Sequence, residues 1–282
     1  MFTSTRSLSA AMAAAMAVTF SASDALAGPL LDRIEAGESI RIGFANEPPF
    51  AYPGADGEPL GFVNAYTLGL LAEMGYDNIE PILTDWGGLI PALNAGRIDI
   101  VTGGMNIMAS RCAAMNFSEP MLMAGDAFIV PAGNPMDLNN YQDLIDKDAN
   151  FITGIGYNHV EIAKDSGVPE AKITQVPGPT EILAAIRAGR ADAGGVAYVT
   201  AVDMVRNNDD IEISDVSQLP ESSMQWASIG FRKSDQDFLD AFNAAQEDWL
   251  GSEPMMAAVA EYGYGPENVP TGQTTAWVCE NR

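Results

Sequence analysis

Two charged side chains of opposite sign each follow a predicted β-strand, where they could hold the two ends of a small zwitterion. Arg111 comes after a strand and a predicted tight turn at Gly103–Gly104, which places it at the carboxyl edge of a sheet. Its guanidinium could hold a carboxylate through two parallel hydrogen bonds, the alternative being a surface arginine at a helix start. Glu47 leaves the first strand beside Pro48–Pro49 and could pair with a cation, or be an ordinary loop acid.

Aromatic and polar side chains near other predicted strand ends could complete such a site. Phe50 and Trp86 could enclose a delocalised cation by cation–π contact, although core aromatics would give the same pattern. Asn158 and His159 open a helix in the second half of the chain, where free N–H groups would suit a carboxylate. Asn158 is expected to be the N-cap of this helix, and His159 to be either a surface residue or a ligand contact.

Other kinds of site are not indicated. The chain has one histidine and two cysteines, none at metal-ligand spacing, so we expect no metal site and no cofactor. No nucleophile motif surrounds His159, so no catalytic residue is assigned. The net charge of −24 argues against a nucleic-acid partner, because phosphate binding needs clustered lysine and arginine.

The N-terminus predicts export to the periplasm. Residues 1–27 combine one basic residue, an Ala/Met-rich apolar run and the small-residue pattern that ends at Ala27, which is typical of a cleavable signal peptide. Residue 28 is glycine and not cysteine, so we expect no lipid anchor. In an oxidising compartment Cys112 and Cys279 are expected to form a disulfide, and we expect a monomer.

Strand-like and helix-like segments alternate in the first half of the chain. Strands are expected at residues 39–45, 79–84 and 98–102, and helices at 64–74, 89–94 and later at 235–250. This alternation predicts parallel strands joined by crossover helices.

A short motif occurs twice, as ALNAGRID at Ala92–Asp99 and as AIRAGRAD at Ala185–Asp192. Each copy combines a helix end, a glycine suited to the left-handed C-cap and a buried strand. A common connector arising twice is the alternative; we favour two similar α/β lobes. Apolar runs at 127–131 and 227–231 then become two crossing hinge strands. Lobe 1 would comprise residues 28–131 and 228–282, and lobe 2 residues 132–227, with the ligand in the cleft between them.

The sequence resembles the periplasmic solute-binding proteins of polar amino-acid type ABC importers, across essentially the whole chain after residue 27. The segments that carry the resemblance are IGFANEPPF at 42–50, GFV at 61–63, WGGLIPAL at 86–93, AGRIDI at 95–100, GGMNIMASR at 103–111 and FSEP at 117–120. The resemblance implies a two-lobed α/β fold of the type II periplasmic binding proteins and no enzymatic activity. It also implies an inner-membrane permease and its ATPase as partners.

Within this family the ectoine- and hydroxyectoine-binding branch is the most similar. Its marks are Glu47 three residues before Phe50, the pair Arg111–Cys112, and GRADAG at 189–194. The resemblance implies a small zwitterionic compatible solute as ligand. The implied ligand contacts are Glu47, Phe50, Trp86, Gly104, Asn106, Arg111, Asn158, His159 and Tyr198.

Two departures from the family pattern bear on the ligand. The aspartate that grips the α-ammonium of amino acids is replaced by Ala197, which Tyr198 follows. Asn106 stands where the ectoine-binding pattern has an aromatic residue, and its amide could hydrogen-bond a hydroxyl or a ring nitrogen. The alternatives are a polar amino acid or another compatible solute, a sensor domain, and a cyclohexadienyl-dehydratase-like enzyme with Glu47 as general acid.

Overall fold

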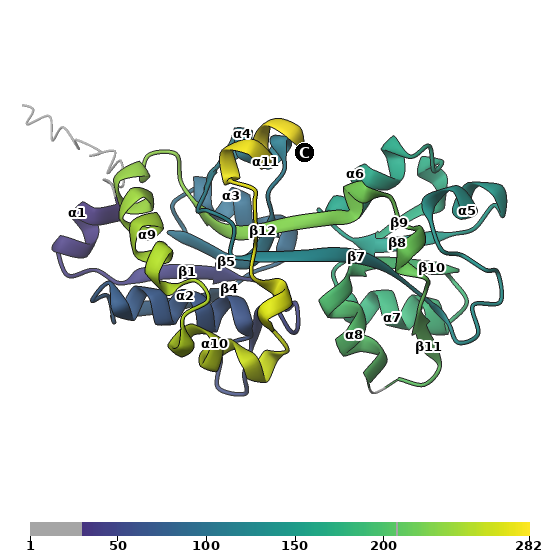
Figure 1. Ribbon diagram of the computed structural model, residues 1–282, viewed down its shortest axis with the longest axis horizontal. Coiled ribbons are helices and arrows are strands. Elements are labelled where there is room, and N and C mark those ends of the chain that lie inside the picture. The colour runs from purple at the N-terminus through teal and green to yellow at the C-terminus, as the bar shows by residue number, and fades with distance from the viewer. Residues whose placement is uncertain (1–29, 207) are drawn as a thin grey trace, which may run out of the picture.

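Two long strands, β7 (Leu122–Pro131) and β12 (Met224–Phe231), run side by side from one lobe of the protein to the other (Figure 1). The computed structural model describes residues 30–206 and 208–282, so the predicted signal peptide at 1–27 lies outside the described residues. Within the described part of the chain, no helix has the length and apolar content needed to cross a membrane.

Lobe 1 is built around the strand order β4-β1-β5-β12, in which β1 pairs in parallel with both β4 and β5. Its first elements are α1 (Leu30–Glu35), β1 (Ile40–Phe44), β2 (Tyr52–Pro53), β3 (Pro59–Leu60), α2 (Phe62–Glu73), β4 (Ile79–Leu83), a 3-10 turn (Trp86–Gly88) and α3 (Leu89–Asn94). The others are β5 (Ile100–Asn106), α4 (Ala109–Ala114), β6 (Asn116–Phe117), α9 (Gln236–Trp249), α10 (Glu253–Val259) and α11 (Thr275–Asn281).

Lobe 2 continues the sheet in the order β7-β10-β8-β9, with β11 on the other side of β7. Its elements are α5 (Tyr141–Asp146), β8 (Phe151–Gly154), α6 (Asn158–Asp165), β9 (Ile173–Val176), α7 (Pro179–Arg187), β10 (Ala193–Ala197), α8 (Tyr198–Arg206) and β11 (Ile211–Ile213). The two-lobed type II periplasmic binding protein fold expected from the sequence is therefore present.

The pairing of the crossing strands locates the change of lobe. Leu122 to Gly125 of β7 pair with β12, whereas Asp126 to Ile129 pair with β10 of lobe 2. The register thus favours a lobe boundary at Gly125–Asp126 in β7, which is earlier in the chain than the boundary after residue 131 that we expected from the sequence. In β12 the interlobe segment correspondingly comes before the pairing with β5 begins at Ala227.

The repeated motif has the same structure in both lobes. Gly96 follows α3 with φ of 67° and Gly189 follows α7 with φ of 63°, the left-handed conformation expected of a helix-ending glycine. The aspartate that closes each copy accepts a hydrogen bond from a backbone N–H at the start of the neighbouring strand. Asp99 accepts from Arg41 N, and Asp192 accepts from Asn150 N.

One local prediction is wrong: Gly103–Gly104 do not form a turn but lie inside β5. The strand continues because Met105 and Asn106 pair with Ser228 and Ala227 of β12. The register shifts between Ser228 and Gly230, so the glycine pair lies opposite an irregularity in the ladder, and Gly104 adopts φ of 69°.

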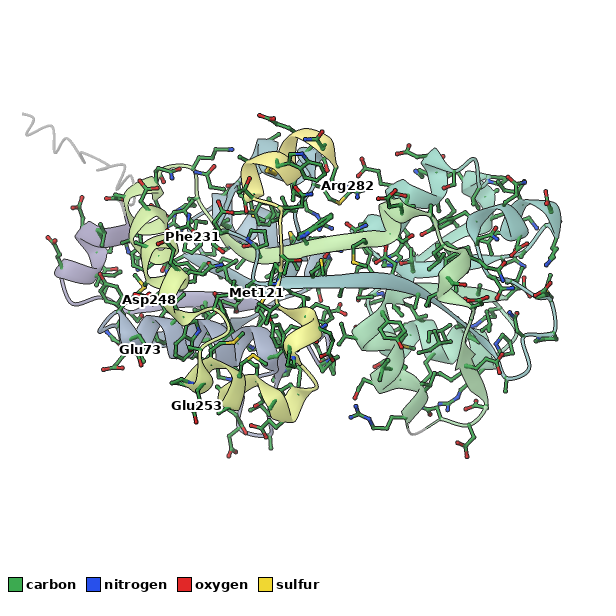
Figure 2. All side chains as sticks on the ribbon, viewed as in Figure 1. Glu73, Met121, Phe231, Asp248, Glu253 and Arg282 are labelled. Atoms are coloured by element: carbon green, nitrogen blue, oxygen red, sulfur yellow. A yellow bond between two sulfur atoms is a disulfide. The ribbon has the colours of Figure 1, made fainter. Side chains whose placement is uncertain are left out.

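Apolar side chains fill both lobes, and charged side chains cover them. In lobe 1, Met121, which directly precedes β7, and Phe231 of β12 are fully buried. Figure 2 shows Glu73, Asp248 and Glu253 on the outer surface of the same lobe, where all three are exposed. The predicted disulfide is present and joins Cys112 of α4 to Cys279 of α11, with the two Cα atoms 5.9 Å apart.

Candidate functional site

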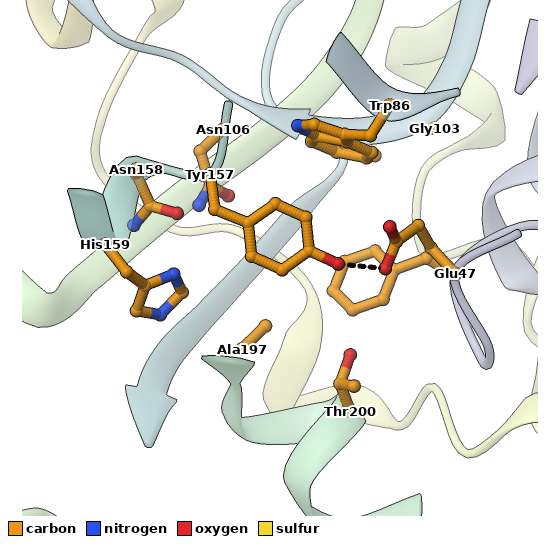
Figure 3. A pocket seen from close by; sticks show the side chains of 11 residues that line it. Glu47, Trp86, Gly103, Asn106, Tyr157, Asn158, His159, Ala197 and Thr200 are labelled. Carbon is orange, nitrogen blue, oxygen red and sulfur yellow. Dashed lines mark hydrogen bonds between the residues drawn. The ribbon is translucent and has the colours of Figure 1, made fainter. Parts of the chain in front are cut away.

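A small cavity lies between the lobes (Figure 3). Its lining residues are Glu47, Phe50, Trp86, Gly103, Gly104, Asn106, Tyr157, Asn158, His159, Ala197 and Thr200. All the contacts implied by the sequence line this cavity except Arg111 and Tyr198. Among the described residues no group of His, Cys, Asp and Glu side chains could hold a metal ion.

The lobe 1 wall is aromatic because two glycines let the rings approach β5 closely. A Cβ atom at Gly104 would lie 2.6 Å from the ring of Phe50, and one at Gly103 would lie 3.1 Å from the ring of Trp86. Phe50 packs on Phe62 with ring centroids 4.7 Å apart, so its position is fixed by the core of the lobe. The glycine pair is therefore a requirement of the cavity wall.

Glu47 is a buried carboxyl group on this wall, with 6% of its surface exposed. It receives a hydrogen bond from the hydroxyl of Tyr157 in lobe 2, and no lysine, arginine or histidine of the described residues pairs with it. Burial raises the pKa of Glu47 to about 8; the Tyr157 hydrogen bond opposes this rise and the nearby Glu181 adds to it. The ordinary-loop-acid interpretation is thus wrong, because Glu47 is enclosed between the lobes.

Tyr157 and Thr200 line the cavity but were not among the ligand contacts predicted from the sequence. Tyr157 lies between Gly156 and Asn158, inside a motif that the sequence did single out, and its ring meets Trp86 edge-on at 5.6 Å. Thr200 is buried in the first turn of α8, directly after β10. The strand-end argument used for Phe50 and Trp86 would have found both.

Arg111 lies beside the cavity and does not line it. Its Nη1 donates to Asn106 O at 2.7 Å and its Nη2 to Gly156 O of lobe 2 at 2.9 Å. Burial lowers the pKa of Arg111 to about 10, which Glu161 partly offsets. The surface-arginine alternative is wrong, because only 8% of the residue is exposed.

Three hydrogen bonds join the lobes at the cavity and hold it closed. The Gly156 carbonyl that accepts from Arg111 also accepts from Trp86 Nε1 at 3.3 Å, and Tyr157 donates to Glu47. Each of these bonds connects a predicted contact residue of lobe 1 with the loop that opens α6. The described conformation is therefore a closed one.

The predictions for the start of α6 need correction. Tyr157 occupies the N-cap position and Asn158 the first helical position, so Asn158 is not the N-cap. Its side chain instead donates to Asp126 Oδ2 at 3.2 Å. His159 is 1% exposed and not a surface residue, because α6 packs on β8 and the His159 ring lies against Asp126 of β7.

Tyr198 does not reach the cavity. β10 ends at Ala197, whose side chain faces the cavity, and α8 begins at Tyr198. This change of backbone direction turns Tyr198 outward, where it is 43% exposed in a groove with Val216 and Met224. Ala197 therefore lines the cavity, whereas Tyr198, the residue that follows it, does not.

The family follows from comparison with known proteins. Residues 40–262 match the bacterial extracellular solute-binding proteins, family 3, and the chain belongs to this family. It is the solute-binding component of an amino-acid type ABC importer, and proteins of this kind bind small ligands and interact with a permease and its ATPase.

Individual relatives cover nearly the whole chain. A probable amino-acid ABC transporter periplasmic-binding protein, y4tE of Sinorhizobium fredii, is 31% identical over 96% of this chain and 93% of its own. The L-cystine-binding protein TcyJ of Escherichia coli is 27% identical over 84% and 87%. The crystal structure of EhuB in complex with hydroxyectoine superposes with a TM-score of 0.82 at 28% identity, covering 90% of this chain and 98% of that one.

Proposed function

We propose that this protein captures ectoine or hydroxyectoine, a small zwitterion with a delocalised cationic ring, in the periplasm for import. The observation that carries the proposal is Glu47, a buried carboxyl group with no cationic partner among the described residues, at the edge of an aromatic wall. Burying such a group without compensation is unfavourable, so the wall is suited to a ligand that brings the cation. Phe50, Trp86 and Tyr157 line the cavity and offer aromatic rings that could contact a delocalised cation.

Arg111 is the proposed partner of the ligand carboxylate. A buried guanidinium that has only two backbone carbonyls as acceptors retains unused donors, and no acid of the described residues forms an ion pair with it. In an open state the bond to Gly156 is broken, because Gly156 belongs to lobe 2. A ligand carboxylate could then take the released donors before the lobes close.

Ala197 weighs against a primary α-amino acid as the ligand. Its methyl group lines the cavity at the position where amino-acid binders of the family carry an aspartate, so an α-ammonium would find no carboxylate there. The structural similarity to EhuB, which was crystallised with hydroxyectoine, supports the same choice.

One observation favours a second candidate, a dehydratase-like enzyme. With its pKa raised to about 8, Glu47 is protonated at neutral pH in the ligand-free closed state and could act as a general acid. Turnover of a cyclohexadienyl substrate distinguishes this candidate from a binding protein, which leaves every ligand unchanged.

The test is a calorimetric and thermal-shift screen of ligand-free protein against ectoine, hydroxyectoine, glycine betaine, arginine, histidine and cystine. We expect an ectoine to bind with micromolar or tighter affinity and to raise the melting temperature, since it binds only the folded state. Arg111→Ala should abolish this shift. Binding of amino acids alone would contradict the proposal, and product formation would favour the enzyme.

A further inference from the structure

Asp126 is a buried carboxylate at the point where β7 passes from lobe 1 to lobe 2. It is 3% exposed, and its backbone pairs with Ala197 across the sheet. It does not line the cavity, but it lies directly behind two residues that do. Its Oδ2 accepts a hydrogen bond from Asn158 Nδ2 at 3.2 Å, and its Oδ1 lies 3.2 Å from His159 Nε2.

The contact with Asn158 fixes which atom of its amide faces the ligand. A carboxylate only accepts hydrogen bonds, so the amide nitrogen of Asn158 must point to Asp126. The amide oxygen then points the other way, and Figure 3 shows it on the side of Tyr157. Asn158 therefore presents an acceptor to the cavity.

His159 lies next to the other carboxylate oxygen of Asp126 but does not form a hydrogen bond with it. Nε2 and Asp126 Oδ1 are close but out of line for a hydrogen bond, and neither ring nitrogen has a hydrogen-bond partner among the described residues. A rotation of the ring that brings Nε2–H into line with Asp126 Oδ1 would form this hydrogen bond. In the neutral imidazole Nδ1 would then be an acceptor. A buried ring with unused nitrogens on the wall of a cavity indicates that a ligand supplies the missing bond.

We propose that Asp126 is a positioning residue that sets ligand specificity: it takes the donors of Asn158 and His159, so that lobe 2 presents two neutral acceptors to the ligand. This inference rests on the proposed function, because it takes the cavity as the ligand site. The acceptors of Asn158 and His159, which Asp126 orients from the strand next to β10, take the place of the aspartate that is absent at position 197. The selected ligands carry N–H or O–H donors, as the ring of ectoine and the hydroxyl of hydroxyectoine do, and quaternary ammonium betaines are excluded.

The first test needs no variant, because His159 is the single histidine of the chain. In protein produced without added histidines, ¹⁵N NMR reports the two imidazole nitrogens separately. We expect the Nε2–H tautomer at pH 7.5. An Nδ1–H tautomer, or an imidazolium, would overturn the proposal, since Nδ1 would then be a donor.

The second test compares Asp126→Asn with Asp165→Asn, which makes the same charge change at an exposed position of α6, the helix that carries Asn158 and His159. Asp126→Asn should abolish the tautomer preference and weaken hydroxyectoine binding roughly tenfold, whereas Asp165→Asn should change neither. Unchanged tautomer and affinity in Asp126→Asn would overturn the proposal.

Ligand selectivity gives a third readout in the wild-type protein. Hydroxyectoine should bind at least roughly 100-fold more tightly than glycine betaine, which has no N–H or O–H donor. Equal binding of the two would overturn the inference while leaving the cavity as a zwitterion site. If no ectoine binds but the Nε2–H tautomer is present and is lost in Asp126→Asn, the proposed function fails and the role of Asp126 stands.

Discussion

Lobe 1 contains two buried carboxyl groups that have opposite surroundings. Asp99, fully buried at the end of the repeated motif, meets Arg33 at 2.6 Å, Arg41 at 2.8 Å and Arg232 at 2.9 Å. Burial by itself would raise the pKa of Asp99, but hydrogen bonds from these three arginines lower it to about 2. Glu47 is nearly as buried, has no cationic partner among the described residues, and its pKa rises to about 8.

The difference between these two acids separates structure from function in this protein. The positive charges that compensate Asp99 come from arginines of the chain itself, so Asp99 contributes to the stability of lobe 1. Glu47 lies between the lobes, where the missing charge can come from a ligand that enters the open cleft. A buried acid without a partner is therefore the better indicator of a binding site than a buried acid in a network.

The largest expected effect is on the structural side of the comparison. Asp99→Asn leaves three arginine side chains around a neutral group, and we expect the free energy of unfolding to fall by about 3–5 kcal/mol in urea denaturation at pH 7. Since the pKa of Asp99 is lowered, this difference should be full above its ordinary value near 4 and vanish as the pH falls through about 2. Ligand affinity should not change.

Asp192→Asn is the matched control, because Asp192 closes the second copy of the motif. It accepts hydrogen bonds only from Asn150 within the described part of the chain, and we expect a loss of about 1 kcal/mol. Equal losses in the two variants would show that the arginines around Asp99 contribute nothing specific.

On the functional side, Glu47→Gln should weaken the binding of an ectoine about 100-fold or more in calorimetry, since the ligand cation loses a buried anionic partner. The control is Glu73→Gln, which removes the same charge from an exposed position on α2 and should leave affinity unchanged. Full affinity in Glu47→Gln would contradict the assignment of Glu47 to ligand binding.

Glu47→Gln also tests a predicted pH dependence of stability in the ligand-free protein. Because the pKa of Glu47 is raised in the folded state, its contribution is full below the ordinary value of 4.5 and is lost as the pH rises through about 8. Thermal melts of wild type and Glu47→Gln should coincide at pH 4.5. At pH 8.5 the variant should be more stable, on the order of 1–3 kcal/mol. Parallel curves over this range would contradict the buried, unpaired state of Glu47.

The smallest expected effect comes from Tyr157→Phe. Loss of its hydroxyl removes the hydrogen bond that lowers the pKa of Glu47, so the loss of stability should still begin near pH 4.5 but continue to a higher pH than in wild type. One interlobe hydrogen bond is also lost, and we expect ligand affinity to change by roughly fivefold at most. A shift of the stability profile to lower pH would contradict this assignment.

Much of the fold was predictable because local patterns and the repeated motif agree with each other. The alternation of apolar runs predicted β1, β4, α2, α3 and α9, and the glycine that ends each copy of the motif adopts the expected left-handed conformation. The turn predicted at Gly103–Gly104 failed, because pairing with β12, more than a hundred residues away, extends β5 through both glycines.

The sequence by itself determined which strand ends carry the polar and aromatic residues of the site, since the order of strands and crossover helices places them at one edge of the sheet. Only the tertiary structure decided which of them face the cavity. The start of α8 turns Tyr198 away, closure of the lobes engages Arg111 with Gly156, and Tyr157 and Asp126 gain their roles through partners on distant segments. Side-chain direction and desolvation depend on contacts between segments far apart in the chain, and a local pattern contains no record of them.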